Sequence, residues 1–241
     1  MVGAAAAADA VLRARRLPAL KVGLHLTVVD DRPVLSPAEI PALAGGDGRL
    51  PSNQVVAGFR FYFNRRTRAD LGREIRAQFE AFARTGLNLD HVNGHRHMHV
   101  HPCVFASMLA VGREFGLKAV RLPRESAVFS WPGIVGQLAW LLLVAPWIAL
   151  MGRRLARAGI AHNDYVFGIA ASGRMTGPTL LSYLARLPDG VSEIYCHPGA
   201  GGADGEAELA ALTAPEIAAA LPRLGIVLAT FGELHARAAR P

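Results

Sequence analysis

The chain has 241 residues, a formal net charge of +7 and two cysteines. This length suffices for one α/β domain with a large core, and two cysteines exclude a disulfide-built scaffold and favour a reducing compartment. The charge excess is mainly arginine, which is typical of proteins that meet nucleic acid or an anionic membrane surface. Since no nucleic-acid-binding motif accompanies it, we expect no nucleic-acid partner and favour a membrane surface.

Helical and strand-like patterns alternate along the chain. The spacing of apolar residues predicts helices over 4–17, 67–84, 104–115 and 178–187. Short apolar and β-branched runs predict strands over 20–29, 89–93, 118–122, 166–171, 193–196 and 226–231. This alternation predicts an α/β fold with a parallel sheet or barrel.

Histidines gather at the predicted ends of three strands. Five of them fall in His91-Val-Asn-Gly-His95-Arg-His97-Met-His99-Val-His101, while His25 and His197 belong to two other strand-like runs. Imidazole is the commonest protein ligand for divalent metals, and α/β folds gather their chemistry at the carboxyl ends of strands. We therefore expect one shared metal-containing pocket. The alternatives are a hydrogen-bonded His-rich turn and a core role for His25.

Four segments carry a family resemblance: Gly23-Leu-His25-Leu, Val92-Asn-Gly-His95-Arg-His97-Met-His99-Val-His101-Pro102, Val120-Arg-Leu-Pro-Arg124-Glu and Glu193-Ile-Tyr-Cys-His197-Pro. In order and spacing they resemble the YdjC-like carbohydrate deacetylases, which include chitooligosaccharide deacetylase. The resemblance implies a metal-dependent hydrolase that removes acetyl groups from N-acetylated sugars. It also implies a single domain over residues 1–241, an irregular (β/α) barrel of the glycoside hydrolase/deacetylase type.

The resemblance places two metal ligands at His25 and His95. It also places Asn93 where the family has a carboxylate, although an amide oxygen can still accept a hydrogen bond. The ion, Mg²⁺ or Zn²⁺, would polarise the acetamide carbonyl and activate a water molecule. Because one ion cannot use every histidine, we expect His97, His99 and His101 to support the ligands or to lie on the substrate side. We expect Asn93 on the substrate side as well.

Two further residues are candidates for catalysis. Amide cleavage needs a proton on the departing nitrogen, and a histidine titrates in the useful range, so we expect His197 to be the general acid. Arg124 follows a predicted strand, where it could orient a carboxylate or hold a sugar hydroxyl. A turn-capping role for His197 and a surface position for Arg124 are the alternatives.

The front of the chain departs from the family. The family opens with a strand that ends in Asn-Ala-Asp-Asp-Phe-Gly and supplies the third ligand and the general base, and this motif does not occur here. Asp30-Asp31 is predicted to form a turn. We therefore expect the chain to lack the first βα unit, and we expect that the natural start lies upstream. A catalytically dead metal-binding homologue is the alternative to an enzyme.

Residues 127–160 form an apolar insertion. Its stretch 131–151 carries no charge, contains Pro146 and precedes Arg153, Arg154 and Arg157. We expect a kinked hairpin or helical flap that dips into one leaflet or covers a lipid substrate. A spanning helix, which would make an integral membrane protein, and a buried helix pair are the alternatives.

The chain is most similar to the family branch associated with hopanoid biosynthesis. That likeness implies conversion of an N-acetylglucosaminyl hopanoid to its glucosaminyl form. The residues by themselves support an amphiphilic glycolipid or an oligosaccharide, and a soluble chitooligosaccharide is the alternative substrate. We expect a cytoplasmic protein in peripheral contact with the inner face of the membrane, and a homodimer stays open.

Overall fold

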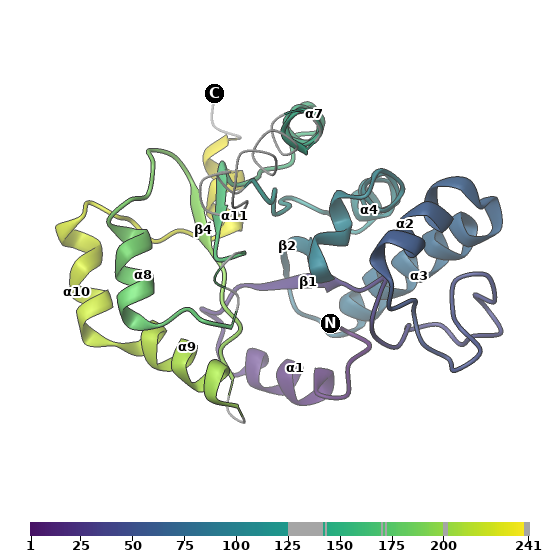
Figure 1. Cartoon of the computed structure of the whole chain (residues 1–241), viewed down its shortest axis with the longest axis horizontal. Helices are drawn as coiled ribbons and strands as arrows, with labels where there is room; N and C mark the ends of the chain where they lie inside the picture. Colours follow the sequence, from purple (N-terminus) through teal and green to yellow (C-terminus); the bar gives the residue numbers. More distant parts are fainter. Residues whose placement is uncertain (125–141, 143, 170, 172, 200–201, 239–241) are drawn as a thin grey trace. The chain divides into compact units, whose positions relative to one another are not determined.

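The computed structural model describes residues 1–124, 142, 144–169, 171, 173–199 and 202–238 (Figure 1). These residues divide between two compact units. Unit 1 comprises 1–121, 156–161 and 230–241, and unit 2 comprises 122–155 and 162–229.

Parallel strands form the centre of unit 1. Strand β1 (Val22–Leu26) pairs with β2 (Leu89–Gly94), and this register places His25 opposite Asn93. Parallel bridges from Val92 to Val120 and from Ala119 to Ala161 add two more chain segments. The strands expected at 20–29 and 89–93 are confirmed, whereas 118–122 contributes only bridge positions.

Helices pack around these strands. Unit 1 contains α1 (Ala7–Arg15), α2 (Gln54–Phe63), α3 (Arg65–Arg84), the 3₁₀ helix η1 (His95–Val100), α4 (Pro102–Glu114) and α11 (Phe231–Ala238). The expected apolar stripe of α3 is buried, because Leu71, Ile75, Phe79 and Phe82 are each at most 5% exposed. Gly86 follows α3 at φ +70°, a left-handed conformation that favours glycine.

Buried polar side chains of α3 fix the loop that follows β1. The Gln78 amide accepts a hydrogen bond from the Thr27 N–H (2.9 Å) and donates one to the Thr27 carbonyl (2.6 Å). The Glu74 carboxylate accepts from the N–H groups of Val34 and Leu35. Burial raises the pKa of Glu74. These contacts hold the loop beyond His25 in one conformation.

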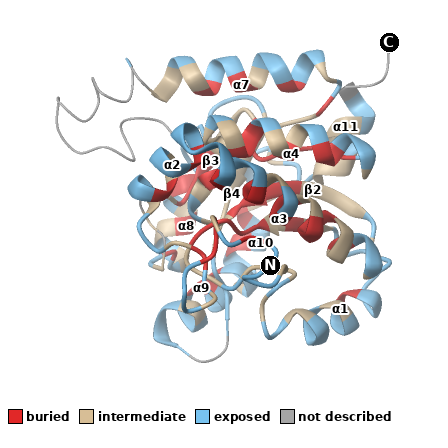
Figure 2. Cartoon of the chain, turned by 90° about the vertical axis from the view of Figure 1, so that its right-hand side faces the viewer, coloured by how far each residue is buried: buried red, intermediate tan, exposed pale blue. Residues whose placement is uncertain are grey.

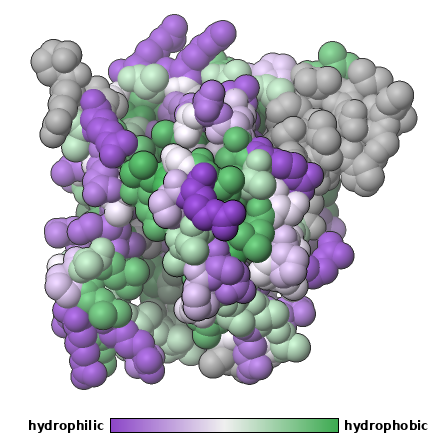
Figure 3. Space-filling model, turned by 90° about the vertical axis from the view of Figure 1, so that its left-hand side faces the viewer, coloured by the Kyte–Doolittle hydropathy of each residue, from purple (hydrophilic) through white to green (hydrophobic). Residues whose placement is uncertain are grey.

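Unit 2 has its own strands and core. Strand β3 (Tyr165–Phe167) pairs in parallel with β4 (Ser192–Ile194), and α8 (Gly177–Leu184), α9 (Ala203–Thr213) and α10 (Pro215–Arg223) belong to the same unit. The core residues are Phe167, Met175, Leu180, Tyr183, Leu184, Ala211 and Ile217. Figure 3 views the side on which α10 lies, where apolar patches are interrupted by hydrophilic side chains. The alternation of strands and helices confirms the α/β class, and barrel closure stays a prediction.

One predicted strand is wrong. Residues 226–230 form no strand, because the Thr230 side chain and Glu233 cap each other's backbone N–H groups and begin α11 at Phe231. Pro146 lies in the first turn of α7 (Ala145–Arg157), directly after the π-helical residues Leu142 and Val144. The kink expected at Pro146 stays a prediction.

Most of the predicted apolar stretch, residues 131–141 and 143, lies outside the described residues. Among the helices that the structure describes, none combines the length and the apolar character that crossing a membrane requires.

Candidate functional site

His25 lies on β1 against the side chain of Asn93 on β2. Its Nδ1 is 2.6 Å from the Asn93 amide, a contact that the parallel register sets. Burial lowers the pKa of His25 to about 4, so the ring is neutral near pH 7. A neutral imidazole is the form that binds a metal ion.

His95 follows β2 directly and lies beside His25. The two ring centroids are 5.7 Å apart and the rings are nearly perpendicular. Two residues separated by 70 positions in the chain thus meet where their strands end. The expected proximity of this pair is confirmed, and metal binding by the pair stays a prediction.

The pair offers donors that would suit part of a metal site. Its donors are two imidazoles, and burial favours the neutral form of His25. Such donors suit Zn²⁺ or another divalent ion. A protein zinc site uses three or four protein ligands. Within the described ranges, no group of three or more His, Cys, Asp or Glu side chains is placed to hold a metal. The residues therefore fit two coordination positions of such an ion.

The Asn93 amide lies between His25 and the Arg121 guanidinium. The orientation that satisfies both neighbours points Nδ2 at His25 Nδ1 (2.6 Å) and Oδ1 at the two Arg121 nitrogens (3.2 and 3.3 Å). In that orientation His25 Nδ1 accepts a hydrogen bond, so the neutral ring carries its hydrogen on Nε2. A carboxylate at position 93 would accept from both neighbours and leave Nε2 unprotonated. Asn93 therefore favours the less suitable tautomer of His25 for binding through Nε2.

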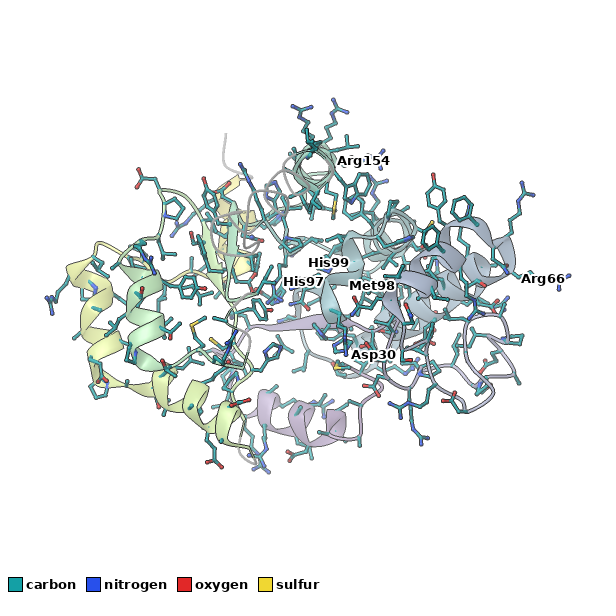
Figure 4. The ribbon with its side chains drawn as sticks, viewed as in Figure 1. Asp30, Arg66, His97, Met98, His99 and Arg154 are labelled. Carbon is teal, nitrogen blue, oxygen red and sulfur yellow. The ribbon has the colours of Figure 1, made fainter. Side chains whose placement is uncertain are left out.

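The turn after β2 has an unusual backbone. Arg96 and His97 have positive φ angles of 47° and 56°, and Asp30 in the loop after β1 has φ 66°. Arg96 Nε lies 2.6 Å from Asp30 Oδ2, and Figure 4 shows Asp30 together with the residues of η1. Non-glycine residues at positive φ cluster at functional sites. The predicted turn at Asp30 is confirmed, but its ion pair with Arg96 had no signal in the sequence.

His99 is fully buried. Its Nε2 donates to the Arg121 carbonyl (3.0 Å), and burial lowers its pKa to about 3. Its Nδ1 meets no hydrogen-bond partner among the side chains and backbone that the structure describes. The His97 ring lies 6.0 Å away. His99 thus supports the backbone of Arg121, and the substrate roles of His97, His99 and Asn93 stay predictions.

Two other histidines of the cluster have structural partners. His101 Nδ1 accepts a hydrogen bond from the Cys103 N–H (3.3 Å) and caps α4. His91 pairs with Asp90 (3.0 Å) and stacks on Phe231, with ring centroids 4.6 Å apart. The histidines of this cluster therefore have different surroundings: His101 caps a helix, His91 packs against Phe231, and His95 lies beside His25.

His197 and Arg124 belong to unit 2. His197 is exposed beyond the end of β4, and its backbone N–H donates to the buried carboxylate of Glu208. Arg124 is exposed as well, with its guanidinium carbon 5.4 Å from the Tyr165 ring centroid. Sequence reasoning missed Glu208, because a single glutamate in a helix looks like a surface residue. The catalytic roles of His197 and Arg124 stay predictions.

A family model, two related sequences and a solved structure each match most of the chain. A family model described as YdjC-like protein matches residues 1–223. A carbohydrate deacetylase of Geobacillus stearothermophilus is 27% identical over 247 residues, covering 98% of this chain and 84% of that protein. A mouse carbohydrate deacetylase is 29% identical over 290 residues, covering 98% and 85%.

A shorter and more similar alignment joins a carbohydrate deacetylase of Vibrio vulnificus, at 41% identity over 105 residues, with 42% of this chain and 38% of that protein covered. Among solved structures, a protein of Enterococcus faecalis named for cellobiose-phosphate cleavage superposes with a TM-score of 0.70. It shares 22% sequence identity and covers 94% of this chain and 82% of its own, so it shows a common fold.

Proposed function

Because the chain belongs to the YdjC-like family, we propose that it is a carbohydrate N-deacetylase, an amide hydrolase that releases acetate from an N-acetylated amino sugar. The observation that carries this proposal is the family match over residues 1–223, which contains every candidate site residue. The meeting of His25 and His95 supports it, since family membership predicts these two residues as metal ligands.

His25 and His95 are the residues that would hold a divalent ion, Mg²⁺ or Zn²⁺. Such an ion, when bound, polarises a carbonyl and lowers the pKa of a bound water. Burial favours the neutral form of His25, while Asn93, held by Arg121, fixes the orientation of its ring.

His197 is the proposed general acid for the departing amine. The exposed imidazole can reach a substrate, and the hydrogen bond from the His197 backbone N–H to the Glu208 carboxylate holds the backbone in place. Arg124 would hold a sugar hydroxyl or a carboxylate through its exposed guanidinium. Asn93, His97 and His99 would line or support the substrate side.

The proposed substrate is an amino sugar carried on a hopanoid, converted from the N-acetylglucosaminyl to the glucosaminyl form. The uncharged stretch 131–151 and the net charge of +7 support an amphiphilic substrate met at the inner face of a membrane. A soluble chitooligosaccharide is the second candidate, favoured by relatives whose names specify carbohydrate alone.

Acetate release tests the proposal. The protein would be purified from its natural source, stripped with a chelator and reloaded with Mg²⁺ or Zn²⁺. It would then be offered N-acetylglucosaminyl hopanoid in vesicles or diacetylchitobiose in solution. We expect one free amine for each acetate released from the glycolipid. Release from diacetylchitobiose alone would select the second candidate, and release from neither substrate would contradict a deacetylase.

A further inference from the structure

Helix α2 presents an apolar face to solvent. Its exposed side chains are Val55 (68%), Val56 (51%), Phe59 (63%), Tyr62 (51%) and Phe63 (73%). At 100° per residue these positions span about one third of the helix circumference. Figure 2 shows α2 at the outside of unit 1, and an apolar face of this kind marks an interaction surface.

The opposite face of α2 anchors it. Ala57 and Phe61 are fully buried, and α2 packs against α3 and α4. The side chain of Asn53 accepts hydrogen bonds from two backbone N–H groups at the start of α2, and Asn64 does the same for α3. The exposed face therefore rests on a fixed helix rather than on a loop.

Its aromatic side chains are already clustered. Phe59 and Phe63 stack with ring centroids 6.1 Å apart, and Tyr62 meets Phe63 edge-on at 5.0 Å. A preformed cluster loses little conformational freedom on binding. Aromatic rings that end in a hydroxyl, as in Tyr62, also suit the boundary between lipid and water.

The segment that contains this face is rich in positive charge. Residues 48–69 contain five arginines and no acidic residue. All five are exposed: Arg49, Arg60, Arg65, Arg66 and Arg68. In Figure 4 the side chain of Arg66 extends away from the ribbon, and the structure gives no ion pair to Arg65 or Arg66 within its described part. An apolar helix face bordered by arginines is complementary to an anionic bilayer.

We propose that the α2 face, defined by Val55, Val56, Phe59, Tyr62 and Phe63, docks unit 1 onto the surface of an anionic lipid bilayer. A second copy of the chain is the less suitable occupant, because a two-fold interface would bring the two sets of five arginines together. Docking does not depend on the hydrolysis proposed above, although it would deliver the chain to a lipid-carried substrate.

Co-sedimentation with vesicles tests the docking. The full chain would be mixed with phosphatidylcholine vesicles, or with vesicles of phosphatidylcholine and phosphatidylglycerol in equal parts. We expect binding to the mixed vesicles and release at high salt, because arginines supply part of the attraction. The double variant Phe59→Ser/Phe63→Ser should bind at least about tenfold more weakly, since it removes two aromatic rings from the apolar face.

A matched control distinguishes binding through this face from nonspecific hydrophobic adsorption to the vesicles. Leu209→Ser/Leu212→Ser replaces two side chains on α9 that are each 44% exposed, and it should bind like the unchanged chain. Acetate release from a soluble substrate is measured in parallel, so that a loss of the proposed activity can be told apart from a loss of membrane binding. Unchanged binding by the α2 variant, or no binding by the full chain, would overturn the docking. A solution dimer that only the α2 variant disrupts would identify a second copy as the occupant and overturn it as well.

Discussion

The two pairs of parallel strands present histidine in different ways. In unit 1, strands of five and six residues place His25 where burial and the Asn93 amide fix its ring. In unit 2, strands of three residues end before His197, which is exposed. A metal ligand has to be neutral and fixed, whereas a proton donor has to reach its substrate. The difference in burial therefore suits the two histidines to the different roles proposed for them.

Removing His25 tests the buried half of this comparison most strongly. His25→Ala deletes one of the two paired imidazoles, and we expect kcat/KM for acetate release to fall about 10³-fold with a parallel loss of zinc affinity. Calorimetric titration with Zn²⁺ measures the affinity. The control, His235→Ala in α11, should retain both properties. If His25→Ala binds zinc as tightly as the unchanged chain, then His25 is not a zinc ligand and the proposed metal site in unit 1 is wrong.

The exposed half is tested by His197→Ala. Loss of a general acid should lower kcat about 10²-fold while leaving zinc affinity and KM nearly unchanged. The dependence of kcat on pH should also lose the limb that reports the acid. A variant that loses zinc affinity as His25→Ala does would show that the two histidines act alike, which would remove the contrast.

Acid should destabilise unit 1 through its buried histidines. The pKa of His25 is about 4 when folded and 6.5 when exposed, so the unfolded chain binds more protons between these values. The stabilisation is complete above pH 6.5 and is lost as pH falls toward 4. We expect His25 to contribute about 2 kcal/mol of this loss between pH 7 and 4.5. Urea unfolding at both pH values measures it, and His25→Gln should reduce the difference.

The substitution Asn93→Asp, for which we expect the smallest effect, tests how the Asn93 amide influences the His25 ring. Asn93→Asp would supply an acceptor to both His25 Nδ1 and Arg121, and would leave Nε2 of His25 unprotonated. We expect zinc affinity to rise about tenfold. The ¹⁵N chemical shifts of the His25 ring report the tautomer before metal is added. Equal shifts in both chains would contradict the proposed effect of the Asn93 amide.

Local patterns in the sequence predicted most of the elements. The apolar stripe of α3 and the strand-like runs around His25 and Asn93 gave the correct elements, because neighbouring residues decide these structures. The run 226–230 was misread as a strand because a capping box at Thr230 outweighs its apolar character.

The sequence by itself determined the α/β class, the family and the candidate site residues. Only the tertiary structure decided what each histidine contacts. It brought His25 to His95, buried His99, set His101 as a cap and joined Asn93 to Arg121. It also left the apolar face of α2 uncovered. Propensity and periodicity depend on residues close together in the chain, whereas burial and ring contacts depend on segments that meet only after folding.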